Sequence, residues 1–320
     1  MTAKNELQKL ILEFPKKGWN WISLSKNPNI DWEFVEANQQ FPWDYGYMAE
    51  NPNISIKIII TNPDKEWGYY KLLRNPSITW EDILHHSYIF GKTDLHIYGA
   101  CLSYNSNITW DIIQTNPRIR WDYVVLSTHP NITWEIVRTN PHLFENEKLL
   151  SQNPNITYEI VRDNPQINWD HGQLSSHPGI TFEYILANPD KPWNYKCVSR
   201  NPNVLFDHVR NNPNILWDYH ELCKNPNIRW DIFENGEFGP YSYEAMSANP
   251  NILFDHIKEN LDKPWSFDTL SRNLFRKDPM LIKCKLAGRV NIVKKIIRND
   301  RYGVFSWLPE EVMEMICRLL

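Results

Sequence analysis

Features that mark a membrane, secreted or common enzymatic protein are missing from this sequence of 320 residues. No run of 18 apolar residues could cross a membrane, and the opening MTAKNELQKL lacks the apolar core of a secretory signal. The five cysteines are odd in number and follow no framework spacing, so we expect no disulfide scaffold. Neither a Gly-rich phosphate loop nor a Gly-x-Ser-x-Gly elbow occurs. We therefore expect a cytoplasmic protein that is not an enzyme.

What the sequence does contain is one motif, copied many times. The stretch HPNITWEIVRTNP, residues 129–141, recurs every 24 residues, with a single step of 30. The position after Asn-x-Ile-x, here called the first ladder, is held by Trp32, Ile56, Trp80, Trp110, Trp134, Tyr158, Phe182, Phe206, Trp230 and Phe254. The second ladder, 11 residues later in the repeat, is Trp19, Trp43, Trp67, Trp121, Trp169, Trp193, Trp217, Tyr241 and Trp265. A fixed period of this size is the signature of a solenoid.

Each repeat reads as two short helices. In ITWEIVRTNP the Thr suits an N-cap, the acidic residue falls in the first helical turn, and Ile, Val and the aromatic residue form an apolar side. We expect the following Asn in the left-handed conformation that often ends helices, with Pro as the stop. The second half of the repeat has the same signals. We therefore predict an all-α protein, an α-solenoid of about eleven two-helix repeats spanning residues 4–271, with a helical cap at residues 272–320.

The pattern Asn-Pro-Asn-Ile-Thr-aromatic-acidic resembles the Asn-Pro-x-Thr-Pro-x-Glu core of leucine-rich variant repeats, which are also 24 residues long. Here an aromatic residue replaces the Pro after Thr. Trp-rich Asn-Pro repeats of this kind are also similar to those expected in large DNA viruses that infect amoebae. The resemblance implies a binding or scaffolding protein of viral origin, located in the host cytoplasm.

Trp residues at fixed positions are expected to form the core, because a buried Trp removes about 150 to 250 Å² from solvent. The residue after the first ladder is acidic in nine of ten copies, which either reflects the helix dipole or forms an acidic stripe for a basic partner. His129 and His177 replace the Asn of Asn-Pro, while His85 and His86 have no Cys or carboxylate at metal-ligand spacing. We expect no catalytic residue, no metal site and no cofactor.

The end of the chain differs from the repeats. From Arg272 to Arg301 there are ten basic and two acidic residues, but the segment lacks the interleaved aromatics of a nucleic-acid surface, so we expect no nucleic-acid partner. Residues 287–297, AGRVNIVKKII, resemble the second helix of an ankyrin unit. A cap on the last repeat is the simplest role for this segment.

The final stretch FSWLPEEVMEMICRLL, residues 305–320, predicts an amphipathic helix that begins at Pro309. It resembles the first helix of an F-box, with matches at Leu308, Pro309, Glu311, Val312, Ile316 and Leu320. A truncated F-box after a repeat array is similar to ankyrin-repeat host-range proteins of poxviruses. The resemblance implies that these residues bind the Skp-type adaptor of a cullin-RING ubiquitin ligase while the array holds a target. The alternative is a structural component of a virion or assembly, with the final helix as a cap.

Overall fold

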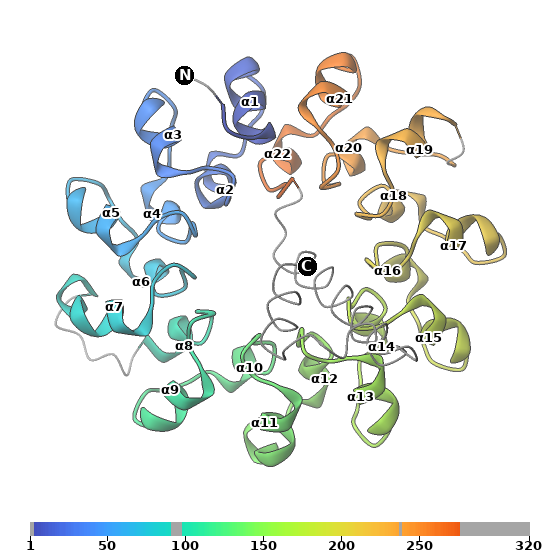
Figure 1. Cartoon of the computed structure of the whole chain (residues 1–320), viewed down its shortest axis with the longest axis horizontal. Coiled ribbons are helices and arrows are strands. Elements are labelled where there is room, and N and C mark those ends of the chain that lie inside the picture. The colour runs from blue at the N-terminus through green and yellow to red at the C-terminus, as the bar shows by residue number, and fades with distance from the viewer. Residues whose placement is uncertain (1–2, 91–97, 237–238, 276–320) are drawn as a thin grey trace, which may run out of the picture. The chain divides into compact units, whose positions relative to one another are not determined.

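The computed structural model describes residues 3–90, 98–236 and 239–275, and all regular elements among them are helices. They belong to a compact unit of residues 1–275. The predicted α-solenoid of short two-helix repeats is confirmed. Its units do not form an open coil, however, but follow one another around a closed ring (Figure 1).

The first helix of each unit lies on the outer side of the ring (Figure 1). These outer helices are α1 (Glu6–Glu13), α3 (Trp32–Ala37), α5 (Ile56–Thr61), α7 (Trp80–His85), α9 (Trp110–Thr115), α11 (Trp134–Thr139), α13 (Tyr158–Asp163), α15 (Phe182–Ala187), α17 (Phe206–Asn211), α19 (Trp230–Glu234) and α21 (Phe254–Glu259). The 3₁₀ helix η1 (Ser87–Phe90) follows α7 in the repeat that is six residues longer than the others, and η3 (Pro141–Leu143) follows α11.

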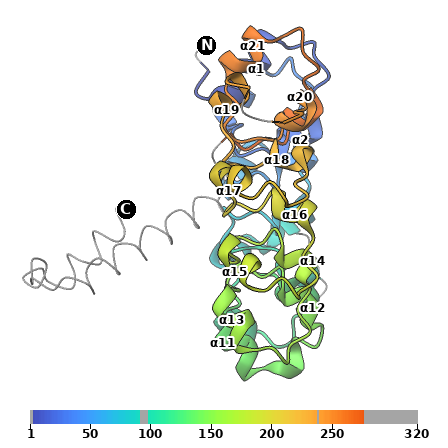
Figure 2. The same ribbon diagram turned by 90° about the vertical axis from the view of Figure 1, so that its right-hand side faces the viewer.

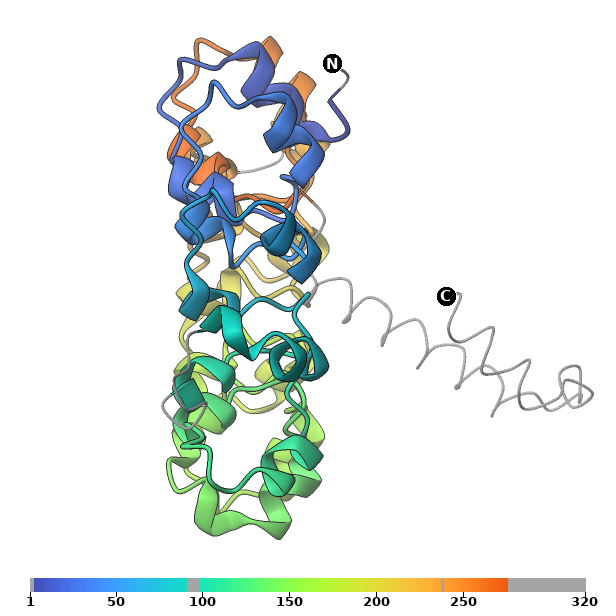
Figure 3. The same ribbon diagram turned by 90° about the vertical axis from the view of Figure 1, so that its left-hand side faces the viewer.

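The second helix of each unit lies on the inner side. These inner helices are α2 (Trp21–Lys26), α4 (Tyr45–Met48), α6 (Tyr69–Leu72), α8 (Gly99–Leu102), α10 (Tyr123–Leu126), α12 (Glu147–Leu150), α14 (His171–Leu174), α16 (Tyr195–Ser199), α18 (Tyr219–Leu222), α20 (Tyr243–Met246) and α22 (Phe267–Leu270). Seen edge-on, the two sets are also offset along the ring axis, so the ring has two tiers (Figures 2 and 3).

The helices begin where the sequence predicts. In α7 the Thr79 hydroxyl accepts from the Asp82 N–H while the Asp82 carboxylate accepts from the Thr79 N–H, a complete capping box. An inner helix such as α14 uses an acidic cap, since the Asp170 carboxylate accepts from the Gln173 N–H at 3.1 Å. Each helix is only one or two turns long, so these caps satisfy a large share of its free N–H groups.

The expected left-handed Asn at the end of each outer helix was wrong. Asn140, which ends α11, has φ −133° and ψ 51°, and among the described non-glycine residues only Phe275 has a positive φ. The Asn140 side-chain amide instead donates to the carbonyl oxygen of Ile136 at 2.9 Å. The Pro that follows explains the difference, because a residue before Pro is pushed towards extended conformations.

The two aromatic ladders differ in burial. Second-ladder Trp residues are 5 to 9 % exposed, and each indole N–H donates to a carbonyl oxygen five residues earlier, as Trp169 does to Asn164 at 2.9 Å. First-ladder side chains are only partly buried, with the single exception of Phe182, which is 2 % exposed. They pack against the second-ladder Trp of the next unit. The aromatic rings of Trp134 and Trp169, for example, have centroids 6.0 Å apart. The second ladder therefore forms the core of each unit, and the first ladder joins neighbouring units.

A row of buried polar side chains runs around the ring. It occupies the repeat position that is the first Asn of Asn-Pro-Asn in most units. The Asn51 amide donates to three backbone carbonyls of the preceding unit, those of Ser25, Asn27 and Ile30, at 2.9 to 3.0 Å. Nine of the eleven positions of this row are Asn: Asn27, Asn51, Asn75, Asn105, Asn153, Asn201, Asn225, Asn249 and Asn273. His129 and His177 hold the other two. We call this row the amide ladder. It satisfies buried carbonyl groups that the short helices leave free.

The ring closes with the same bonds that join neighbouring units. The Asn27 amide donates to the carbonyl oxygens of Ser271 and Asn273, both at 3.0 Å, as Asn51 does to the corresponding atoms of Ser25 and Asn27. The Asn20 N–H donates to the Ser271 hydroxyl at 2.9 Å. Between neighbouring units the equivalent bond joins the Asp218 N–H to a serine hydroxyl, also at 2.9 Å.

Side chains add to this closure on the outer side. The rings of Phe14 and Phe254 stack with centroids 6.3 Å apart, and Lys258 pairs with Glu13 at 3.1 Å. The Glu6 carboxylate accepts from the Phe254 N–H at 2.8 Å. Helices α1 and α21, which are far apart in the sequence, therefore lie side by side (Figures 1 and 2).

The unit at the closure, or seam, is built from both ends of the repeat region. The N-terminal segment supplies α1 and α2, and residues 273–275 supply the turn that precedes the outer helix in other units. The Phe275 N–H bonds to the Asn273 side-chain oxygen at 2.8 Å, as Asn53 does to Asn51 at 2.9 Å, and the Asn29 amide donates to Leu274. The repeat packing therefore continues to Phe275, beyond the end expected at 271.

Candidate functional site

The six residues expected to bind an adaptor lie outside the described residues. They are Leu308, Pro309, Glu311, Val312, Ile316 and Leu320, all beyond residue 275. The expected cap, residues 272–320, lies there as well except for its first four residues. The candidate sites considered below belong to the ring.

The acidic residues after the first ladder are all exposed on the outer helices. Several have a cation beside them. Glu135 forms a bidentate pair with Arg138, Asp231 pairs with Arg229 at 2.7 Å, and Lys4 reaches Glu33. These pairs neutralise part of the row. Its position in the first turn of each helix fits a favourable interaction with the helix dipole.

The two ladder histidines have a structural role. The Nε2 atoms of His129 and His177 lie 3.0 Å from the carbonyl oxygens of Asn105 and Asn153, and the Nδ1 atom of His177 faces the Gly179 N–H at 3.0 Å. This arrangement requires a neutral ring with the proton on Nε2, since Nδ1 must accept. Burial lowers the pKa of both imidazoles below the ordinary value and keeps them neutral.

The described residues show no constellation suited to metal binding. Among them, no group of three or more His, Cys, Asp or Glu side chains is arranged to hold a metal ion. His85 is exposed and His86 is half-buried, and the Nδ1 atom of His85 lies 2.9 Å from the carbonyl oxygen of Glu81 in its own helix. The Cys223 thiol is buried, and burial raises its pKa, which disfavours the reactive thiolate.

A hollow of about 450 Å³ lies between the units that contain α9 and α11. Its walls include Trp110, Trp121, Arg118 and Leu143. The unit of α11 has Glu145 at the second-ladder position, and its neighbour Phe144 packs against Trp110 instead, with centroids 6.4 Å apart. Phe is smaller than Trp, so the hollow follows from this substitution in the ladder.

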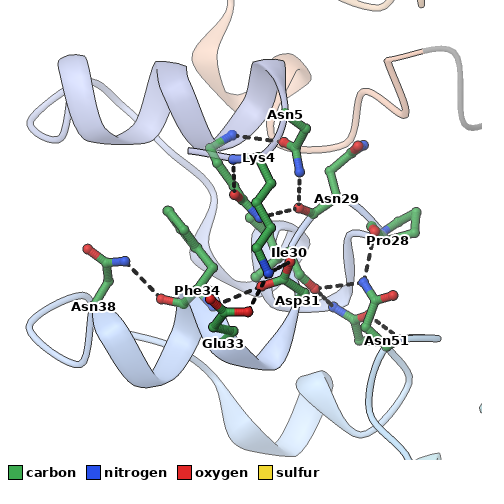
Figure 4. Close-up of polar contacts among 12 residues, drawn as sticks. Lys4, Asn5, Pro28, Asn29, Ile30, Asp31, Glu33, Phe34, Asn38 and Asn51 are labelled. Atoms are coloured by element: carbon green, nitrogen blue, oxygen red, sulfur yellow. Dashed lines mark hydrogen bonds and ion pairs between the residues drawn. The ribbon is translucent and has the colours of Figure 1, made fainter. Parts of the chain in front are cut away.

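A smaller hollow, of about 180 Å³, lies beside the N-terminal segment, between α1 and α3. Lys4 lies 3.4 Å from Asp31 and also contacts Glu33, while the Asn5 amide donates to the Asn29 carbonyl at 2.7 Å (Figure 4). These polar contacts fasten α1 to the next unit. The hollow is thus part of the packing that holds the first helix in the ring.

A third candidate is a group of aromatic and basic side chains on consecutive inner helices or on the two residues that follow them. It consists of Lys26, Tyr47, Tyr70, Lys71, Arg74 and Tyr104, and is called the tyrosine–cation surface below. The Lys71 ammonium lies 2.9 Å from the centre of the Tyr47 ring, Lys26 lies 5.3 Å from the same ring, and Arg74 lies 4.7 Å from the Tyr104 ring. Each contact joins two neighbouring units, and together the contacts span three successive junctions.

Sequence reasoning missed this surface because it concentrated on what the repeats share. The available signal was a departure from the repeat, since no other unit has Tyr at the positions of Tyr70 and Tyr104 or Lys at the position of Lys71. No helix in the described part of the ring is both long and apolar enough to cross a bilayer. The chain matches no protein-family model, no curated protein and no solved structure.

Proposed function

We propose that this protein is a non-enzymatic scaffold for protein–protein interaction, in which a closed ring of repeats holds a target. Repeat arrays bind through the extended surface that their stacked units create. A ring also fixes the spacing of every unit relative to the others. A rigid surface of this kind loses little conformational entropy on binding, which favours its use as a scaffold.

The observation that carries the proposal is the seam between Asn27 and Asn273. An open solenoid has two end surfaces that must be capped to avoid association. Here each end covers the other through hydrogen bonds at 3.0 Å, so residues 276–320 are not needed as a cap on an open end. The closed ring is also poorly suited to act as an extended strut in an assembly, because it has no free end to prolong.

We further propose that the F-box-like residues 308–320 recruit the Skp-type adaptor of a cullin-RING ubiquitin ligase, with the ring as the target-binding part. This rests on the sequence resemblance at Leu308, Pro309 and Ile316, together with the argument that the ring does not need a cap. In this arrangement the protein brings a target to the ligase, as the ankyrin-repeat host-range proteins resembled by the sequence are expected to do.

Co-precipitation and thermal unfolding of the double variant Leu308→Ala, Ile316→Asp test this proposal. We expect loss of the adaptor from the precipitate and an unchanged melting temperature, because a charge in a desolvated interface costs several kcal/mol while the ring is unaffected. A conservative variant, Ile316→Val, should retain the adaptor. Absence of the adaptor from the wild-type precipitate, with a lower melting temperature in the double variant, would show that the segment stabilises the fold instead.

A further inference from the structure

The exposed apolar side chains of the inner helices are not distributed evenly around the ring. Within the described residues, the large ones on these helices or on the two residues after each helix are Ile22, Tyr69, Tyr70, Tyr104 and Val124, which are 38 to 58 % exposed. All five fall between α2 and α10. Because the units are near copies of one another, packing requirements alone do not explain why one half of the inner side exposes aromatic and aliphatic groups.

The other half of the inner side has charged or small residues at the same repeat positions. The position of Tyr70 is occupied by Lys148, Gly172, Lys196, His220, Glu244 and Asp268 in the later units. That of Tyr104 is occupied by Gln152, Ser176, Arg200, Lys224, Ala248 and Arg272. In the first half, the units next to Tyr70 have Gly46 and Ala100 at its position, and the position of Tyr104 is Glu50 or Arg74 in the units before it. Tyr70 and Tyr104 are therefore local departures from the repeat that lie in two successive units.

The cations of the inner side also differ in their partners. In the later half, the carboxylate of Glu221, a residue 6 % exposed, lies 2.9 Å from Lys224 and 3.9 Å from Arg200. In the tyrosine–cation surface, Lys71 and Arg74 have no carboxylate within ion-pair distance among the described residues, and their contacts are with tyrosine rings. Their positive charge is therefore available to an incoming anionic group.

We propose that the tyrosine–cation surface binds an acidic peptide segment of a partner protein, one that also carries aromatic or aliphatic side chains. Its carboxylates would pair with Lys71 and Arg74, and its apolar side chains would cover Tyr70, Tyr104 and Val124. Tyr and Arg are the residue types most enriched in binding hot spots. This inference deepens the proposed scaffold function by stating the chemistry of the target.

Charge disfavours two other occupants. A single-stranded nucleic acid needs a continuous basic track, whereas this surface has three cations and one of them, Lys26, lies 3.9 Å from Glu50. The second disfavoured occupant is the protein's own segment from Arg272 to Arg301. With ten basic and two acidic residues, it has the same sign of charge as Lys71 and Arg74 and would be repelled by them. An acidic, partly apolar peptide complements both features of the surface.

The test measures binding of a fluorescently labelled copolymer of glutamate and tyrosine to the full-length protein by anisotropy. We expect binding that weakens at high salt, and a loss of about tenfold or more in affinity for the double variant Tyr70→Ala, Tyr104→Ala, as for the truncation of hot-spot residues. The matched control is Lys148→Ala, Gln152→Ala, which alters the same two repeat positions on the other half and should leave the affinity unchanged. Both tyrosines are 54 % exposed, so the melting temperature should stay constant in the double variant.

Three results would overturn the inference: no binding of the copolymer to the wild-type protein, equal affinity in the two double variants, or tighter binding of labelled oligothymidine than of the copolymer. The last result would assign the surface to a nucleic acid. A labelled copolymer of lysine and tyrosine serves as the charge control, and any binding of it should be equal in the wild-type protein and the double variant Tyr70→Ala, Tyr104→Ala. None of these outcomes depends on the adaptor at residues 308–320, so failure of this inference and failure of the recruitment proposal can be told apart.

Discussion

The side-chain amide of Asn27 donates to the backbone carbonyl oxygen of Asn273 at 3.0 Å, although 246 residues separate them in the sequence. Inside the repeat region the same bond joins Asn225 to Asn201 at 3.0 Å, across 24 residues. Chemically, the seam is therefore one more junction between units. A ring with no weak junction should unfold as one cooperative body, because every unit has two neighbours.

The seam can be tested with a matched pair of single substitutions. Asn27→Ala and Asn225→Ala each remove two buried bonds to backbone carbonyls at 3.0 Å, together with the bond that the Asn side-chain oxygen accepts from the N–H two residues later, at 2.8 Å. We expect each to lower the free energy of unfolding by about 2 to 4 kcal/mol, since a lost buried donor costs about 1 to 3 kcal/mol in unsatisfied partners alone. Urea unfolding gives both values. A large effect of Asn225→Ala combined with no effect of Asn27→Ala would mean that the ring is open at the seam in solution.

The two aromatic ladders should respond differently to truncation. Trp169→Ala removes a side chain that is 7 % exposed and bonded to Asn164, so we expect a loss of about 3 to 5 kcal/mol in the free energy of unfolding. Trp134→Ala should cost clearly less, because Trp134 is only partly buried, although its ring packs against Trp169 at an interplanar angle of 43°. Chemical denaturation of the two variants provides the comparison. Equal losses would contradict the difference in burial.

Much of this architecture is readable from the sequence. The period, the Thr caps and the two ladders predicted the units and the helices, since these depend on short-range signals within one repeat. The closure was not predicted, because the small rotation from one unit to the next is set by packing between units and is not written in any single repeat. One signal did exist. Asn273 begins another Asn-x-x turn after the last complete unit, but the first-ladder position that should follow it holds Asp278 instead of an aromatic residue, which indicates that another part of the chain supplies the outer helix.

The amide ladder was also missed, for a different reason. The sequence showed Asn before Pro as a helix terminator, and the local interpretation explained its presence. Asn51 is buried and bonds to three carbonyls of the neighbouring unit, a role that only the stacked structure reveals. His129 and His177 occupy the same ladder and fit because an imidazole Nε2–H can donate as the Asn amide does.

These two histidines predict a specific loss of stability in acid. In the folded ring, burial holds their pKa below the ordinary value of 6.5, so the unfolded chain binds more protons than the folded one as pH falls below about 6.5. Their contribution to stability is therefore complete above that pH and is lost progressively below it. The double variant His129→Asn, His177→Asn restores the residue found at the other nine ladder positions. Its melting temperature should fall less between about pH 7.5 and pH 5 than that of the wild type. Identical slopes would show that the histidines are not protonation-sensitive in the ring.

Glycine at residue 68 allows two successive inner helices to approach closely. A Cβ at this position would lie 2.3 Å from the carbonyl oxygen of Gly46, a backbone atom that cannot move without shifting α4. Gly68→Ala should therefore lower the free energy of unfolding by about 1 to 3 kcal/mol, as for overpacking elsewhere. Gly18→Ala is the control, because a Cβ there meets nothing within 4 Å. Thermal unfolding should show the loss in Gly68→Ala alone.

Two truncations that differ by four residues separate the seam from the remainder of the C-terminal segment. A chain that ends at Phe275 keeps the carbonyls of Asn273 and Leu274, which accept from Asn27 and Asn29 at 3.0 and 3.1 Å. A chain that ends at Ser271 loses both, and with them the bonds from the Asn273 amide to Ser247 and Asn249 at 2.8 and 2.9 Å. The buried amides of Asn27 and Asn29 would then each keep one acceptor, Ser271 and the Asn27 side-chain oxygen respectively, and lose the other, so the seam loses four hydrogen bonds in all, at a cost of several kcal/mol. We therefore expect the melting temperature of the chain ending at Phe275 to match that of the full-length protein, and that of the chain ending at Ser271 to fall markedly. A large fall in both would mean that residues 276–320 stabilise the ring after all, as a cap would, and would count against their release for adaptor binding.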